Sequence, residues 1–242
     1  NYYDGYYRGY VKASMNKINN TLADYQVDCD QTGWGFNPIL SVDYHNKNLT
    51  LAAKYEFRAK MNIPNKTNAN SDPQGLLYAF RDGAKTRYDM PALLTVALGY
   101  DFTPKLRATV EYHFFDDKNA RMADNRQKQL THGTNEYLLG AEYDINKTFT
   151  ISAGAQRTDY GLSDGYETNT SFACDSYSVG AGGAVNLNSH VRINAGYFVT
   201  LYSDYKKHVD AGSPGYCNTT LEGTDIYSRT NKVFGIGIDY KF

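Results

Sequence analysis

Apolar and polar residues alternate along most of the chain. The longest alternating stretch runs from Asn48 to Asn62, where apolar side chains recur at every second position from Leu49 to Met61. A period of two places successive side chains on opposite faces of a β-strand. Strands of soluble sandwiches commonly end after about five or six residues. The pattern therefore predicts a strand long enough to cross a membrane, which takes about 9–11 residues.

The same alternation recurs and predicts about ten strands in all. A weaker first strand is expected around Tyr3 to Met15. The apolar sets of the other strands begin at Trp34, Leu49, Leu94, Leu106, Tyr137, Phe149, Tyr177, Val191 and Phe234.

Short and long connections alternate between these strands along the chain. Tight turns rich in Asn, Asp or Pro are expected at 44–48, 101–105, 144–147 and 186–190. Long polar segments lie near 17–31, 63–86, 117–133, 159–173 and 203–226, and an amphipathic stretch at 123–131 is assigned to its loop. Outer-membrane barrels have short periplasmic turns and longer extracellular loops. We therefore expect a periplasmic C-terminus.

The predicted fold class is all-β, a transmembrane antiparallel β-barrel in the outer membrane of a Gram-negative bacterium. A soluble β-sandwich also has many strands with turns between them, but it predicts scattered strand and loop lengths. Composition excludes a bundle of membrane helices, because each span needs about 20 mostly apolar residues in a row, and none is present. The mean hydropathy is −0.59, with 23 Tyr and 21 Gly. Such a polar, aromatic-rich average is typical of a membrane barrel.

Charge and motifs exclude other function classes. The net charge of −1 gives no nucleic-acid-binding bias. No G-x-S-x-G, H-E-x-x-H, Walker or dinucleotide motif occurs, so we expect neither an enzyme nor a cofactor. A catalytic role for His113 beside Glu111 or Asp116 is the weaker alternative. The cysteines lack metal-ligand spacing, so no metal is expected. A signal peptide, if there was one, has been removed or lies outside the chain.

The chain ends in a strand with an aromatic last residue. Its apolar set resembles the C-terminal signal that the outer-membrane assembly machinery recognises, and comprises Phe234, Ile236, Ile238, Tyr240 and Phe242. An ordinary last strand would look similar. The resemblance implies the assembly machinery as a partner.

A wider resemblance is to the FadL/TodX family of outer-membrane transporters for hydrophobic compounds. It begins with Gly33-Trp-Gly-Phe-Asn-Pro and continues through Asp89-Met-Pro91 to the strand pairs of the tail, such as Leu138-Leu-Gly-Ala-Glu-Tyr143 with Phe149-Thr-Ile-Ser-Ala-Gly154. It implies a fourteen-stranded barrel with an N-terminal plug. Neither the plug nor the first strands are found, so residues 1–242 are expected to be the C-terminal part of such a barrel. The alternative is a shortened relative that closes with about ten strands.

The odd and even positions of each strand lie on opposite faces of the sheet. We expect one set to face lipid: Leu49, Leu51, Tyr55, Phe57, Val110, Tyr112, Ile236 and Ile238. The other set faces the lumen, and its candidate substrate-binding residues are Lys54, Arg58, Lys60, Arg107, Glu111, His113 and Phe198. Mixed charge in a barrel lumen favours a network of paired charges that fills it. The functional alternative is that the three cations on one strand, Lys54, Arg58 and Lys60, bind a ligand carboxylate.

Two functions remain open. The resemblance implies uptake of hydrophobic small molecules such as long-chain fatty acids. The alternative is a FadL-like barrel that acts as a protein-binding shuttle or attachment subunit of a secretion system, through its extracellular loops. A lipid in the lumen would favour the first, and a stoichiometric protein partner the second.

The extracellular cysteines suggest a disulfide. Cys174 and Cys217 lie on the predicted extracellular side, where the compartment permits disulfides. Cys29 could take either partner, or pair with a segment outside the chain. The 174 to 217 pairing is the one we predict.

Overall fold

The structure is a computed structural model, and it describes residues 2–15, 20–71, 80–168, 171–216 and 219–241. The chain divides into two compact units. Unit 1 comprises Asn1–Pro38, Phe57–Ala92 and Asn119–Gln127, and unit 2 comprises Ile39–Glu56, Leu93–Lys118 and Lys128–Phe242.

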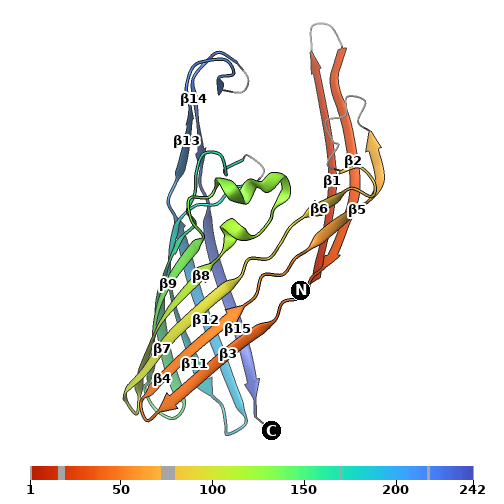
Figure 1. The fold of residues 1–242 in the computed structure, drawn as a ribbon. Coiled ribbons are helices and arrows are strands. Elements are labelled where there is room, and N and C mark those ends of the chain that lie inside the picture. Colours follow the sequence, from red (N-terminus) through yellow and green to blue (C-terminus); the bar gives the residue numbers. More distant parts are fainter. Residues whose placement is uncertain (1, 16–19, 72–79, 169–170, 217–218, 242) are drawn as a thin grey trace. The chain divides into compact units, whose positions relative to one another are not determined.

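Unit 2 is built on an antiparallel sheet of nine strands (Figure 1). Its strands are β3 (Ile39–Asn46), β4 (Leu49–Glu56), β7 (Leu93–Thr103), β8 (Leu106–Phe115), β9 (Thr134–Asp144), β10 (Phe149–Asp159), β11 (Ser176–Asn186), β12 (Val191–Tyr202) and β15 (Thr230–Tyr240). Neighbours in the sheet follow the order β15-β12-β11-β10-β9-β8-β7-β4-β3. The alternating pattern thus predicted these strands correctly.

Four tight turns join consecutive strands of this sheet. They connect β3 to β4, β7 to β8, β9 to β10 and β11 to β12, and they lie at the end of the sheet where the chain terminates (Figure 1). The predicted alternation of short and long connections is therefore confirmed for this unit.

The two edge strands of the sheet each pair with a neighbour on one side only. Among the described strands, β3 and β15 form the edges, and no hydrogen-bonded ladder joins them. The described sheet is open, and closure into a barrel stays a prediction. It holds nine of the ten predicted strands, and the tenth, expected around Tyr3 to Met15, forms a strand in the sheet of unit 1 instead.

Unit 1 contains a sheet of four strands, in the order β1-β2-β5-β6. These are β1 (Tyr2–Met15), β2 (Asn20–Trp34), β5 (Asn62–Ser71) and β6 (Lys85–Arg87). The assignment of 17–31 and 63–86 to loops was wrong, because β2 and β5 fall within them. Both strands are polar and lack a continuous apolar alternation, so only their backbone pairing reveals them.

The strand predicted from Asn48 to Asn62 is shorter in the structure. β4 ends at Glu56, and the next residue, Phe57, donates its N–H to the carbonyl of Pro38 at 3.0 Å. The residues that follow Glu56, Phe57–Ala92, belong to unit 1. The strand expected to begin at Trp34 also starts later, since Trp34 ends β2 and β3 begins at Ile39.

Two of the long connections contain regular structure. Between β8 and β9 lie the 3-10 helices η2 (Asp117–Asn119) and η3 (Ala123–Gln129), where the sequence had suggested only a loop. Between β12 and β15, β13 (Tyr205–Val209) pairs with β14 (Gly223–Tyr227) as an antiparallel ladder. Phe172 and Tyr205 both pack near Tyr227, with ring centroids 5.2 and 6.5 Å away.

Candidate functional site

The register of the nine-stranded sheet separates its side chains into two faces. Directly opposed residues of antiparallel strands share a face. One cross-strand row therefore places Leu51, Leu98, Val110, Leu139 and Val179 on a common face. We call it the outer face. Large apolar side chains on it are strongly exposed, for example Leu139 at 58%.

The predicted lipid-facing set gathers on this outer face. By register it includes Leu49, Leu51, Tyr55, Val110, Tyr112, Ile236 and Ile238. Phe57 is the exception, because it follows the end of β4 and belongs to unit 1. The outward apolar residues of β15 are all more than half exposed, from Tyr240 at 59% to Ile238 at 70%. Phe242 lies outside the described residues.

The opposite, inner face carries two neighbouring rows that are rich in glycine. The first row runs Thr109, Gly140, Gly154, Gly180, Phe198 and Val233. The second runs Arg107, Glu142, Ser152, Gly182, Gly196 and Gly235. Glycine inside a strand has no side chain to pack and often marks close approach of another group. The glycines leave a bare backbone floor on strands β9, β10, β11, β12 and β15.

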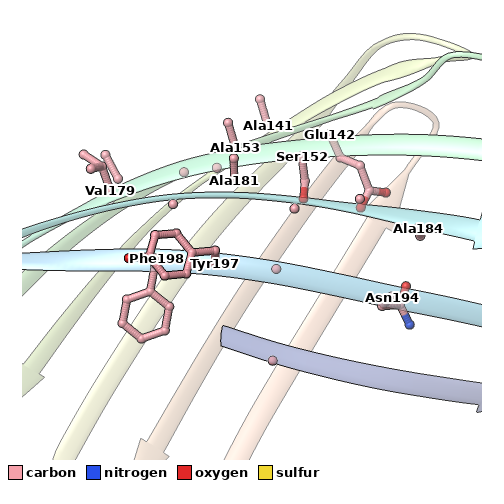
Figure 2. A pocket seen from close by; sticks show the side chains of 18 of the residues that line it. Ala141, Glu142, Ser152, Ala153, Val179, Ala181, Ala184, Asn194, Tyr197 and Phe198 are labelled. Atoms are coloured by element: carbon pink, nitrogen blue, oxygen red, sulfur yellow. The ribbon is translucent and has the colours of Figure 1, made fainter. Parts of the chain in front are cut away.

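A cavity of about 950 Å³ lies over this region of the sheet, and we call it the glycine hollow. Figure 2 shows Phe198 and Asn194 on β12 and Ser152 and Glu142 on neighbouring strands around it. Phe198 packs directly on the floor, because a Cβ on Gly180 would lie 2.8 Å from the Cβ of Phe198. Phe198 is therefore an aromatic wall held against glycine.

One end of the hollow carries a fixed ion-pair network. Arg107 contacts Glu142, and its Nη1 donates to Oδ2 of Asp144 at 3.0 Å. The hydroxyl of Thr150 donates to the other carboxylate oxygen of Asp144 at 2.7 Å. Arg107, Glu142 and Thr150 all line the hollow. Charge-assisted hydrogen bonds of this kind hold a guanidinium in place.

A second network crosses the inner face of β8, β9 and β10. His113 lies between two carboxylates, with ring nitrogens 3.1 Å from Glu136 and 3.3 Å from Glu111. Glu136 also accepts hydrogen bonds from Gln156 at 2.9 Å and Thr158 at 3.2 Å. Each named group thus has a partner within the wall.

Comparisons with solved structures identify the fold. The crystal structure of a Pseudomonas aeruginosa FadL homologue matches with a TM-score of 0.61 at 15% identity, over 92% of this chain and 55% of that chain. A crystal structure of the Pseudomonas putida toluene transporter TodX matches with a TM-score of 0.50 at 15% identity, over 90% of this chain and 52% of that chain. The chain has a FadL-like fold. It spans about half the length of each of these two proteins. No family model and no curated protein sequence matches it.

Within this FadL-like fold, the three cations predicted on one strand do not form one cluster. Lys54 lies on β4 and pairs with Glu56 at 2.7 Å, whereas Arg58 and Lys60 belong to unit 1. Arg58 donates to the carbonyl of Asn119. The expectation failed because β4 ends at Glu56, so the period of two no longer relates these side chains.

Asp89 organises the cations of unit 1. Its buried carboxylate pairs with Arg87, lies 4.0 Å from Nε of Arg58, and accepts the N–H groups of Met61 at 3.2 Å and Arg121 at 3.3 Å. Burial raises the pKa of Asp89, but the hydrogen bonds from Arg87 and these N–H groups lower it by more, so the pKa lies below its usual value. The cluster is a satisfied buried ion pair.

The other predicted residues lie on the inner face of the sheet. Arg107, Glu111 and Phe198 line the glycine hollow, and His113 lies beside Glu111. The ion pairs favour the paired-charge alternative for Arg107, Glu111 and His113. A role of any of these residues in binding substrate stays a proposal.

The cysteines are partly described. Cys29 and Cys174 are buried, and the thiol of Cys174 donates to the carbonyl of Tyr227 at 3.5 Å. Burial raises the pKa of Cys174. Cys217 lies outside the described residues, so the disulfide with Cys174 stays a prediction. Non-reducing peptide mapping tests it, and a free thiol at Cys174 would contradict it.

The described residues contain no group of three or more His, Cys, Asp or Glu that could hold a metal ion. None of their helices is long and apolar enough to span a membrane.

The sequence reasoning missed the glycine hollow. The sequence did contain a signal for it. Gly140, Gly154, Gly180 and Gly182 all fall at the polar positions of the alternating pattern. Their gathering into two rows depends on the register between strands, which no single stretch of sequence contains.

Proposed function

We propose that the protein passes hydrophobic small molecules across the outer membrane of a Gram-negative bacterium. The glycine hollow carries the proposal, because it offers space on the inner face of a sheet whose outer face is apolar and exposed. Ligand sites of this size are mostly apolar, with a few fixed polar groups. Phe198, Val233 and Leu138 supply apolar contacts, and Arg107 and Glu142 lie at the polar end.

The outer face would contact lipid. In membrane barrels, strands whose residues alternate between apolar and polar form the lipid-facing band with their apolar side chains. The short turns and the C-terminus would lie in the periplasm, and the exposed apolar residues of β15 would be recognised by the assembly machinery. The FadL-like fold supports this orientation, and one protein with that fold is named as a toluene transporter.

Filling the hollow tests the proposal. A Cβ on Gly196 would lie 3.8 Å from its nearest neighbour, the carbonyl oxygen of Ala181, so Gly196→Phe adds a ring without displacing backbone. We expect uptake of the neutral fluorescent probe N-phenyl-1-naphthylamine into proteoliposomes of the full-length protein to fall about tenfold.

The matched control is Gly99→Phe. Gly99 lies on the same inner face but outside the hollow, and a Cβ there meets Thr109 at an ordinary 3.5 Å. Uptake by this variant should stay close to that of the wild type. Equal uptake by wild type and Gly196→Phe would contradict the proposal, and a stoichiometric protein partner on the loops would favour the secretion alternative.

A further inference from the structure

The inner face of the nine described strands is acidic. Its inward positions carry three cations, Lys54, Arg107 and Arg192. Its eight carboxylates are Asp43, Glu56, Asp101, Glu111, Glu136, Glu142, Asp144 and Asp239. With neutral histidines, eight negative and three positive groups give this face a formal charge of −5. The whole chain, by contrast, has a net charge of only −1.

The three inward cations all have partners within the wall. Lys54 Nζ lies 2.7 Å from Glu56, and Nε of Arg192 donates to Asn194 at 3.1 Å. Arg107, which lines the hollow, contacts the carboxylates of both Glu142 and Asp144. A ligand carboxylate would compete with these two carboxylates for the guanidinium.

The surroundings make that exchange unfavourable. A wall of one sign repels ligands of the same sign, and low-dielectric surroundings strengthen the effect. Rings of Asp and Glu select for cations in membrane channels by the same physics. Specificity can therefore arise from repulsion as well as from attraction.

Resting on the proposed function, we propose that the glycine hollow selects its ligands by charge. It takes uncharged and cationic hydrophobic molecules and rejects hydrophobic carboxylates. Glu142 and Asp144 determine this specificity by occupying Arg107. This runs against the sequence-based alternative that inward cations hold a ligand carboxylate, and it agrees with the paired-charge network.

The first experiment compares three ligands with one tail. The full-length protein in nanodiscs of zwitterionic lipid is loaded with N-phenyl-1-naphthylamine, which is then displaced by decanol, decylamine or decanoate at pH 8, with empty nanodiscs as the blank. We expect decanol and decylamine to displace the probe at concentrations about tenfold lower than decanoate. Equal displacement by decanoate and decanol would overturn the inference.

The second experiment frees Arg107. The double variant Glu142→Gln, Asp144→Asn should lower the ratio of the decanoate to the decanol displacement concentration about tenfold. The matched control is Asp43→Asn, Glu56→Gln, which removes two inner-face carboxylates that do not line the hollow. Equal gains in both doubles would show that Arg107 has no special part and would overturn the assignment to Glu142 and Asp144.

The outcomes separate this inference from the proposed function. If decanol does not displace the probe, or does so equally in Gly196→Phe, the proposed function fails and the inference with it. If decanol binding depends on Gly196 but decanoate binds equally well, only the charge selection fails. Heat-modifiable migration on gels and circular dichroism verify that each variant is folded.

Discussion

The two halves of the inner face differ sharply although they share one outer face. The inward positions of β3, β4, β7, β8 and β9 hold seven carboxylates, while those of β10 and β11 hold no charged residue. Long side chains, several of them in ion pairs, occupy the charged half, and glycines leave much of the other half bare. In the proposed function, the outer face fixes only the contact with lipid, and the inner face determines which ligands the protein binds.

Placing a lysine on each face of β9 is expected to give the largest effect. Leu139 is outward and Leu138 inward, although they are adjacent in sequence. Leu139→Lys should destabilise the protein in lipid vesicles by about 2–4 kcal/mol, because a lysine in the lipid core is costly. Leu138→Lys, which meets the inner cavity, is the control and should cost much less. Denaturant titration of the free energy of unfolding measures both, and equal costs would refute the assignment of faces.

Breaking the hydrogen-bond network of the charged half should lower the free energy of unfolding by a smaller amount. Glu136→Ala removes the acceptor shared by His113, Gln156 and Thr158. Partly buried donors without acceptors typically cost about 1–3 kcal/mol. Glu136→Gln, which keeps an acceptor oxygen, should be less destabilising in the same titration. An alanine variant as stable as the wild type would show that the network contributes nothing.

The smallest loss of folding stability is expected from breaking a hydrogen bond next to the glycine rows. The hydroxyls of Ser178 and Thr200 lie 2.8 Å apart on the inner face of β11 and β12. Ser178→Ala should cost about 0.5–1.5 kcal/mol, the net value of one hydrogen bond. A double-mutant cycle with Thr200→Val isolates the pair. Independent, additive losses would mean that the two hydroxyls do not interact.

The strand boundaries illustrate what local pattern misses. Alternation continues through Phe57 and Ala59 with no residue that breaks a strand, so the sequence predicts no end at Glu56. In the structure β4 pairs with β7 only as far as Glu56 opposite Leu93, and the chain then enters unit 1. The end of a strand depends on its partner's length, which its own sequence does not contain.

The sequence predicted the candidate site only in part, because it shows which face a residue lies on and not which residues of other strands it contacts. Phe198, Arg107 and Glu111 were placed on the inner face by parity alone, and the structure agrees. Their parity could not reveal that Arg107 is held by Glu142 and Asp144, because those residues lie on another strand. Nor could it show that glycines from β9, β10 and β11 form one floor.

By itself the sequence determined the all-β class, the exposed apolar face and the end at which the short turns gather. These follow from a period of two and from turn residues, which act over a few neighbouring positions. The tertiary structure alone decided where strands stop, which charges pair and where the wall is bare. Those properties depend on the register between strands, and register is set by contacts between residues far apart in the chain.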